Sequence, residues 1–165
     1  MHRSTYDKCG IFVNKYLDPN KELNILDVGS LNENGSYDNL FFNQKWLYEG
    51  CDIIPGANVN FVMLDKFTIP RKDESYDVVI SGQTMEHVDF FWVWIRELTR
   101  VLKKDGLLFL TAPGNGPVHR SPIDCWRFHP DGMIALAEWS DLEVLESYMT
   151  TENEWWDCVL IAKKK

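Results

Sequence analysis

The sequence predicts one α/β domain over residues 1–165, with a doubly wound, seven-stranded, mostly parallel sheet whose last strand is antiparallel. Short apolar segments alternate with amphipathic ones along the chain, which is typical of parallel strands joined by helical crossovers. Small, polar or acidic residues follow the first five apolar segments, at the sheet edge where such folds bind ligands. A length of 165 residues also suits a single hydrophobic core.

The first helix and the first strand are expected before Gly29. Ser4-Thr5-Tyr6-Asp7 matches a capping box, apolar residues follow at helical spacing to about Leu17, and Asp18-Pro19-Asn20 ends the helix. Residues 24–28 form a short apolar run that Gly29 breaks. This is the pattern of a buried parallel strand that leads into a loop.

The middle of the chain contains strands with little helix between them. After Ser36 the pattern predicts a short helix at residues 37–42 and strands at residues 46–53, 58–65 and 76–80. No long helix precedes the third or the fourth strand, so the connections there are expected to be loops.

The clearest helix is expected at residues 91–102, where the apolar residues share one face. Lys103 and Lys104 favour the negative end of its dipole, and Gly106 is expected to supply a left-handed stop. The rest of the chain predicts a strand at residues 107–111, a helix at 130–139 with Pro130 in its first turn, and strands at 142–149 and 155–162. Only a short turn separates the last two strands, so they must be antiparallel.

Composition excludes several classes of function. The net charge is −8 and the basic residues are scattered apart from the C-terminal lysines, so a nucleic-acid partner is not expected. The longest apolar run, residues 90–95, is far shorter than the roughly 20 residues of a membrane span. Since no apolar signal segment follows the N-terminus, we expect a cytoplasmic protein. The four cysteines form no C-x-x-C pair, which predicts reduced core thiols and neither a disulfide framework nor a zinc site.

The loop after the first strand has the composition of a ligand-binding turn. Gly29 lets a ligand approach the backbone, and Gly35-Ser36 precedes a helix start whose free amides suit polar or anionic groups. A dinucleotide fold would place G-x-G-x-x-G here, but Leu31 occupies the second glycine position and Asp27 precedes the first. This pattern resembles the first motif of class I S-adenosylmethionine-dependent methyltransferases, which have a Rossmann-like fold. An acid at Asp27 suits a cofactor that carries a sulfonium and an ammonium group.

The resemblance extends over about residues 26–147. Asp52 stands where that family places the acid that accepts both ribose hydroxyls, and Leu64-Asp65 resembles the stretch that holds adenine. Residues 77–88 resemble the fourth strand and the loop beside the methionyl group, and residues 98–108 resemble the family's RVLKPGG stretch. The resemblance implies S-adenosyl-L-methionine as cofactor, S-adenosyl-L-homocysteine as its product, and a cofactor site of Asp27, Gly29, Ser30, Gly35, Asp52, Ile53, Leu64, Asp65, Ser81 and Gln83.

The chain departs from the family pattern at two places. Ser30-Leu31 replaces the usual G-x-G, which we interpret as the mark of a variant subgroup, and the helices usual after strands two and three are reduced to loops. The chain is therefore expected to be a minimal version of the fold. The altered turn also leaves open a catalytically inactive binding or interaction module. The missing second glycine argues against a nicotinamide-dependent oxidoreductase.

The segment of residues 114–130 is too long for a simple connection and rich in ionisable groups, so it is expected to serve a function. It resembles a subgroup of small methyltransferases with an HR-P-D-CWRF-P stretch, several of them associated with sugar or polysaccharide modification. The resemblance implies transfer to a small molecule or a sugar or glycan precursor, which we expect to be O-directed.

Histidines are the candidates for a general base, because they titrate near neutrality. We expect His119 or His129 to act as the base with Asp124 as its orienting partner, and His87 and Arg127 to contact substrate. In the alternative interpretation Arg127 pairs with Asp124 to brace the loop, Trp126 and Phe128 pack beneath it, and His129 caps the next helix. No metal is expected, since the spacing of His119, Asp124 and His129 matches no ligand pattern.

Two segments have no assigned chemistry of their own. The helix within residues 1–20 is expected to cover the cofactor, with Arg3 paired to a carboxylate of the methionine moiety, and the alternative is a frayed terminus. The run of residues 90–94 is interpreted as core or as the surface of a homodimer, in preference to a substrate site.

Overall fold

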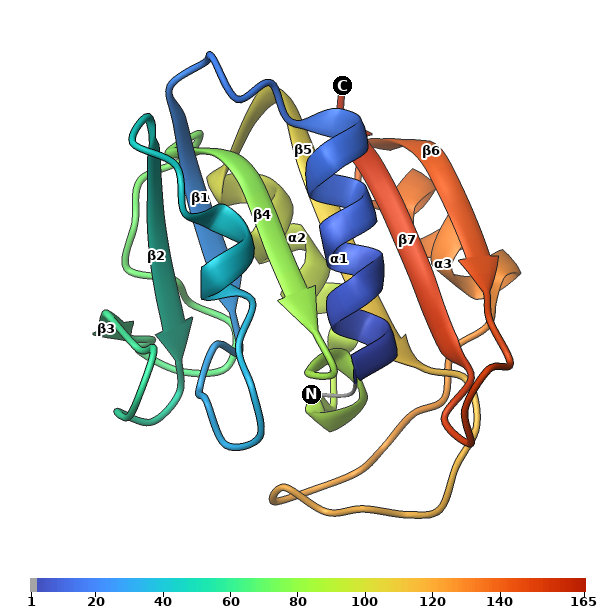
Figure 1. Cartoon of the computed structure of the whole chain (residues 1–165). Coiled ribbons are helices and arrows are strands. Elements are labelled where there is room, and N and C mark those ends of the chain that lie inside the picture. Colours follow the sequence, from blue (N-terminus) through green and yellow to red (C-terminus); the bar gives the residue numbers. More distant parts are fainter. Residues whose placement is uncertain (1–2) are drawn as a thin grey trace.

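The computed structural model describes residues 3–165 and contains one seven-stranded sheet in the order β3-β2-β1-β4-β5-β7-β6 (Figure 1). Its strands are β1 (Leu23–Val28), β2 (Trp46–Asp52), β3 (Phe61–Val62), β4 (Tyr76–Gly82), β5 (Leu102–Pro113), β6 (Leu142–Met149) and β7 (Asp157–Lys164). The first five strands pair in parallel, and β7 is antiparallel to both β5 and β6. The predicted fold class is thereby confirmed.

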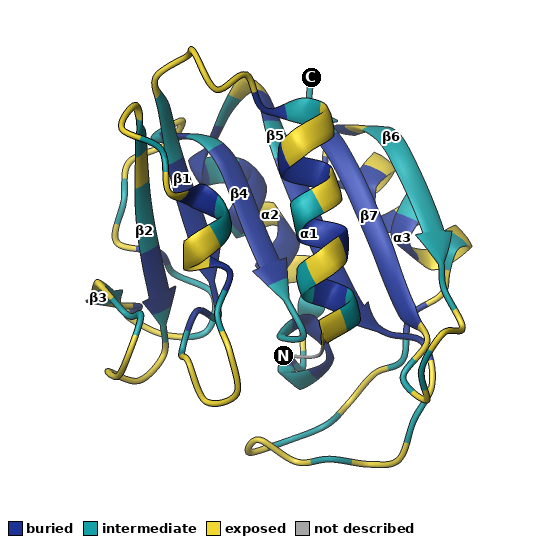
Figure 2. Cartoon of the chain, viewed as in Figure 1, coloured by how far each residue is buried: buried dark blue, intermediate teal, exposed yellow. Residues whose placement is uncertain are grey.

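Helices cover both faces of the sheet. The helix α1 (Arg3–Tyr16) crosses one face, and α2 (Phe91–Val101) and α3 (Pro130–Trp139) lie on the other, with short 3₁₀ turns η1 (Asp38–Phe41) and η2 (Met85–His87) in the loops (Figure 1). Figure 2 shows the central strands buried along most of their length. Alternate residues of one strand enter different cores: Ile25 packs beneath α1, and Leu26 packs on the side of α2 and α3. Burial on both sides explains the continuous apolar runs of these strands.

The strand order places a crevice between β1 and β4. From β1 the chain builds outward through β2 to β3, and from β4 it builds in the opposite direction through β5. At such a reversal the loops beyond the carboxyl ends of the two strands diverge and leave room for a ligand. The long loop between β5 and α3 also lies beyond these strand ends, at the bottom of Figure 1. The topology thus gathers the loops after β1, β2, β4 and β5 at one edge.

Three local predictions are wrong. Ser4 does not cap α1: it lies inside the helix and its hydroxyl donates to the Asp157 carboxylate of β7. Gly106 does not supply a left-handed stop, because α2 passes directly into β5 and Asp105 takes the positive φ of 60°. The third strand is only two residues long, since it pairs with nothing but the end of β2.

The aromatic run and the cysteines divide between core and surface. Trp94 is buried in the core, whereas Phe90, Trp92 and Val93 are exposed. Three of the four cysteines are buried and all are free thiols, but Cys125 is exposed, so its prediction as a core thiol is wrong. Within residues 3–165 we find no helix with the length and apolar character to cross a membrane.

The contact between α1 and the sheet depends on Phe109, whose ring is fully buried and stacks on that of Phe12 at 5.0 Å. Phe109→Ala is expected to lower the free energy of unfolding by about 3–5 kcal/mol, because a large buried ring leaves a cavity. Urea denaturation of the purified variant measures the change. Phe42→Ala is the matched control, since Phe42 is 95% exposed and its loss should change stability by about 0.5 kcal/mol or less. Equal losses in the two variants would contradict this assignment of the core.

Candidate functional site

A cavity of about 710 Å³ opens beyond the carboxyl ends of β1, β2 and β4. This volume is within the range of pockets that hold small molecules and cofactors. Seven of the ten residues predicted to bind the cofactor line it, namely Asp27, Gly29, Ser30, Gly35, Asp52, Ile53 and Gln83. Most of the residues predicted to bind the cofactor therefore lie around one cavity, and their binding of the cofactor stays a prediction.

The loop after β1 folds tightly over the end of β2. The backbone amides of Gly29 and Ser30 both donate to the carbonyl of Cys51, at 2.9 and 3.0 Å. Gly29 has a φ of 79°, and a Cβ at this position would lie 2.2 Å from the Thr84 side chain. The residue must be glycine for both reasons, and the bare backbone that results lines the cavity.

Asp27 is a buried acid at the wall of the cavity. Its Oδ2 accepts a hydrogen bond from the Tyr48 hydroxyl at 2.6 Å, a neutral partner that leaves the charge of the ionised acid uncompensated. Desolvation by burial raises the pKa of Asp27 to about 7, and the negative charge of Asp52 adds to the shift. A cationic group in the cavity would be attracted to this carboxylate.

Asp52 presents a carboxylate at the rim, where β2 ends. Its Oδ2 accepts from the Leu31 amide at 3.1 Å and its Oδ1 accepts from the Ile53 amide at 2.7 Å, so both oxygens are fixed in place. A carboxylate has about four acceptor positions, and two backbone amides leave capacity for further donors. A pair of neighbouring hydroxyls is a ligand group that such an acid can hold.

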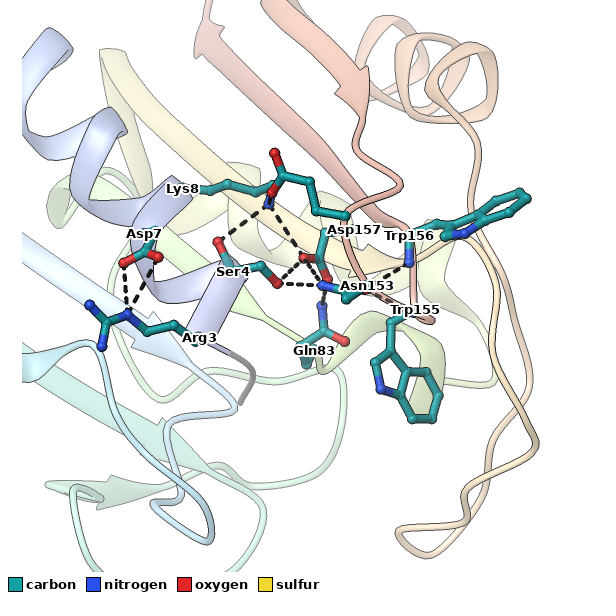
Figure 3. Close-up of polar contacts among 10 residues, drawn as sticks. Arg3, Ser4, Asp7, Lys8, Gln83, Asn153, Trp155, Trp156 and Asp157 are labelled. Atoms are coloured by element: carbon teal, nitrogen blue, oxygen red, sulfur yellow. Dashed lines mark hydrogen bonds and ion pairs between the residues drawn. The ribbon is translucent and has the colours of Figure 1, made fainter.

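Gln83 joins the cavity to a buried polar network (Figure 3). Its Nε2 lies 3.4 Å from Oδ1 of Asp157, a fully buried carboxylate that also pairs with Lys8 at 3.5 Å and accepts from Asn153 at 3.1 Å. Ser4 donates to the same carboxylate from α1. Sequence reasoning missed Asp157 and Lys8, because they stand 149 residues apart and neither belongs to a recognisable motif.

The other end of the cavity carries His87 and His119, whose rings lie 4.9 Å apart. Beside them Glu86 is completely buried, with its Oε1 at 3.7 Å from Nε2 of His87 and 3.9 Å from Nε2 of His119. Burial raises the pKa of Glu86 to about 8 and lowers the pKa of His87. Sequence reasoning assigned Glu86 no role, although it directly precedes His87.

The loop after β5 is braced as the alternative interpretation predicted. The two terminal nitrogens of Arg127 donate to the two oxygens of Asp124 at 2.6 and 2.8 Å, and one of them also donates to the Pro117 carbonyl. The Arg127 guanidinium holds the pKa of Asp124 well below its usual range. Asp124 accepts in turn from the backbone amide of His119 at 2.7 Å. The brace therefore fixes the segment that carries His119.

Two aromatic residues pack this loop against the domain. Trp126 donates from Nε1 to the Val88 carbonyl at 3.0 Å, and Phe128 is buried against Phe91. His119 packs edge-on against Trp155 on the cavity side, with ring centroids 4.7 Å apart. These contacts close the loop over the edge of the cavity.

Several predicted site residues lie away from the cavity. Leu64 is 73% exposed, and Asp65 accepts from the amide of Phe67 two residues on; Met63 and Lys66 line the cavity in their place. Three other predicted residues also do not line the cavity. Ser81 is buried and donates to the Val28 carbonyl, and Arg127 braces the loop after β5. His129 is exposed at the start of α3 and makes no side-chain capping bond.

Among the described residues, none of the N-terminal helix lines the cavity. Its buried residues, among them Cys9 and Phe12, pack on the sheet. Arg3 forms an exposed ion pair with Asp7 at 3.2 Å and does not line the cavity. His2, which belongs to the same predicted segment, lies outside the described residues.

Comparison with known proteins gives one family match. Residues 27–110 match the family described as "Methyltransferase domain". A curated relative, (S)-coclaurine N-methyltransferase of Papaver somniferum, is 24% identical over 120 residues that cover 68% of this chain and 34% of the relative. The chain thus spans about a third of the length of that relative.

Solved structures of other proteins share the fold at low identity. A 1,6-didemethyltoxoflavin-N1-methyltransferase of Burkholderia thailandensis, solved with 1,6-didemethyltoxoflavin and S-adenosylhomocysteine, is 14% identical with a TM-score of 0.74, covering 99% of this chain and 77% of its own. A SAM-dependent methyltransferase of Aquifex aeolicus is 16% identical with a TM-score of 0.68, and both chains are covered completely. At these identities the likeness concerns the fold.

The loop after β1 can be tested through its glycine. Gly29→Ala is expected to lower the free energy of unfolding by at least about 1–2 kcal/mol, because alanine disfavours the left-handed backbone and its methyl group meets Thr84. Gly132→Ala is the matched control, since Gly132 lies in α3 and the added carbon would meet nothing within 4 Å beyond its chain neighbours and the backbone of its own helix. Helix propensity predicts that this control gains up to about 1 kcal/mol. Chemical denaturation of both variants measures the changes, and a stable Gly29→Ala would contradict the geometry of the loop.

Proposed function

Since the chain belongs to the family of class I S-adenosylmethionine-dependent methyltransferases, we propose that it binds S-adenosylmethionine in this cavity and transfers the methyl group to a small acceptor in the cytoplasm. One observation carries the proposal: Asp27 and Asp52, at the ends of the adjacent strands β1 and β2, face one cavity across the Gly29 loop. Both acids fall within the segment that matches the family.

The residues of the cavity fit this cofactor. We assign the ribose hydroxyls to Asp52, whose oxygens are fixed at the rim and retain acceptor capacity. We assign the ammonium group of the methionine moiety to Asp27. This acid is buried, and the hydrogen bond that it accepts comes from the neutral hydroxyl of Tyr48. Ile53 and Met63 provide apolar wall for adenine, and the bare backbone of Gly29 allows the ligand to approach closely.

The acceptor is proposed to enter at the end that carries His87 and His119. The sulfonium group supplies an activated methyl, so the protein chiefly needs to hold a nucleophilic atom in line with it. Of the three residues predicted to be catalytic, only His119 lines the cavity, and Asp124 orients it from behind. Trp155 packs against His119 at this end, and the Asp124–Arg127 pair holds the loop that carries it.

We propose a hydroxyl of a small molecule or of a sugar or glycan precursor as the methyl acceptor. The size of the cavity suits a cofactor with a small acceptor, and the resemblance of residues 114–130 to sugar-modifying methyltransferases supports a polyol. The coclaurine and didemethyltoxoflavin enzymes are N-methyltransferases, so the choice of oxygen rests on the loop and its ionisable groups.

Binding of the cofactor product tests the proposal. S-adenosylhomocysteine at about 100 times its dissociation constant should stabilise the protein by about 2.7 kcal/mol and raise its Tm by roughly 5–10 °C. Asp52→Ala should abolish the shift. Asp65→Ala should keep it, because Asp65 is an acid at the next strand end that does not line the cavity. NAD should give no shift. Absence of any shift at millimolar S-adenosylhomocysteine would favour a chain that acts only as an interaction module.

The affinity for S-adenosylhomocysteine should depend on pH through Asp27. In the unbound protein the pKa of Asp27 is about 7, so the acid is mostly protonated at pH 5.5 and ionised at pH 8. The ammonium group of the ligand needs the ionised form, and affinity should therefore rise with pH, by about tenfold or more from pH 5.5 to pH 8.

Titration calorimetry at several pH values measures this dependence. Asp27→Asn keeps the shape of the side chain but removes its titration, so the variant should bind more weakly and with a flatter pH profile. An identical profile in the variant and the unmodified protein would contradict the contact between Asp27 and the ammonium group.

A further inference from the structure

We propose that Glu86, His87 and His119 form a binding site for a divalent transition-metal ion at the acceptor end of the cavity. One ligand atom from each of the three residues can be chosen so that all lie within 4.8 Å of one another. Glu86 and His87 come from η2, and His119 comes from the loop after β5. No metal was expected from the sequence, because the spacing of His119, Asp124 and His129 matches no ligand pattern, and Glu86 and His87 were not considered as ligands.

The first support is the state of the Glu86 side chain. Its relative exposure is 0%, and neither carboxylate oxygen has a hydrogen-bond partner among the described residues. An isolated carboxylate is strongly disfavoured in such a place, and buried acids in proteins are normally paired or coordinate metals. Two imidazole nitrogens lie near its Oε1, His87 Nε2 at 3.7 Å and His119 Nε2 at 3.9 Å. A bound cation would compensate the carboxylate.

The second support is the orientation of both imidazoles. Nδ1 of His87 is hydrogen-bonded to the Ile123 carbonyl, which requires the proton on Nδ1 and leaves a lone pair on Nε2 facing Glu86. Nε2 of His119 also faces Glu86, while its Nδ1 lies 3.2 Å from Oδ2 of Asp124 without forming a hydrogen bond to it. Histidines that bind metals generally donate their other ring nitrogen to a carbonyl or a carboxylate, as His87 does to Ile123.

The brace of the loop completes the outer layer of this site. Asp124 is 1% exposed, and Arg127 binds both of its oxygens, so the carboxylate behind His119 is fixed in position. Asp124 also accepts from the backbone amide of His119, so it holds the segment that carries this imidazole. Asp124 is a positioning residue for His119 in this assignment.

The set of donors selects the kind of ion. Two imidazoles and one carboxylate suit Zn²⁺, Co²⁺, Fe²⁺ or Mn²⁺, whereas Mg²⁺ and Ca²⁺ prefer oxygen ligands. Ligands about 2.1 Å from one tetrahedral ion are about 3.4 Å apart. The separations of 3.7 and 3.9 Å from Glu86 are a few tenths of an ångström longer, and no two ligand atoms of the set are more than 4.8 Å apart. Three protein ligands leave at least one coordination position open to the cavity.

The open position gives the ion a role toward the acceptor, and this step rests on the proposed function. A hydroxyl oxygen bound to the ion would release its proton to water more readily and would be held near the methyl group. As the C–O bond forms, the C–S bond breaks and its electron pair stays on the sulfur, which leaves as S-adenosylhomocysteine. His119 would then contribute a ligand nitrogen, and deprotonation would not require it as a free base. The site favours acceptors that offer a hydroxyl, with or without a second neighbouring oxygen.

Metal binding to the chelator-treated, tag-free full chain tests the site without any cofactor. Titration with Co²⁺ should give visible absorption bands of an imidazole-bound ion with one equivalent per chain, and Zn²⁺ should displace them. Glu86→Gln and His119→Asn should each weaken binding at least tenfold. His129→Asn should bind as the unmodified protein does, since His129 is an exposed histidine beyond the same loop.

Folding and cofactor binding are measured on the same samples, so that loss of a metal ligand can be told apart from loss of the folded structure. Glu86→Gln replaces a buried carboxylate by a neutral side chain of equal size, so its near-ultraviolet circular dichroism should match that of the unmodified protein. If Glu86→Gln does not fold, His119→Asn decides the test, because His119 is only partly buried.

Two results would overturn the site: no binding of Co²⁺ or Zn²⁺ at millimolar concentration, or equal binding by folded Glu86→Gln or His119→Asn. A shift in Tm with S-adenosylhomocysteine in chelated protein would show that the proposed function stands independently. Loss of that shift together with intact metal binding would overturn the proposed function and leave the ion site standing.

Discussion

Helices cover both faces of the sheet, and this burial decides where polar chemistry can occur. Ile25 and Leu26 are adjacent in β1 and both have no exposed surface, because one packs toward α1 and the other toward α2 and α3. Side chains that carry charge on the inner strands are therefore displaced to the strand ends. Asp27 and Asp52 stand at two such ends, where the reversal of strand order leaves a cavity between the diverging loops.

The buried Asp157 network connects this framework to the cavity. Asp157 begins β7, Ser4 and Lys8 belong to α1, and Gln83 follows β4 with a positive φ of 55°. One carboxylate thus fixes the docking of a helix, the start of a strand and the side chain of a cavity residue. Since a buried charge without its partners is strongly destabilising, the position of Gln83 is tied to the correct packing of α1.

The sequence predicts the elements whose signal is local and misses those that distant pairing decides. The helix at residues 130–139 was predicted with the bounds found for α3, because Pro130 and the apolar spacing lie within it. The left-handed residue after α2 was predicted at Gly106 but is Asp105. The helix ends earlier than its sequence pattern indicates, because Leu102 pairs with Tyr76 of β4 and begins β5. Asp27, Gly29 and Asp52 line the cavity because each stands at or just after the end of a strand, and their binding of the cofactor stays a prediction. Leu64 and Asp65 do not line it, because the chain turns back directly after β3, where Asp65 bridges to Thr68.

The loop after β5 shows why structural and chemical interpretations of one residue need not compete. Arg127 pairs with Asp124, as the bracing interpretation predicted, and Oδ2 of the same Asp124 lies 3.2 Å from Nδ1 of His119, the candidate base. Because the brace removes the freedom of the loop, it also fixes the ring whose other nitrogen faces Glu86. Glu86 itself carried no signal in the sequence, since an acid beside a histidine is common and its burial depends only on how η2 packs. The chemistry of this end of the cavity is set by a tertiary contact between two segments more than thirty residues apart.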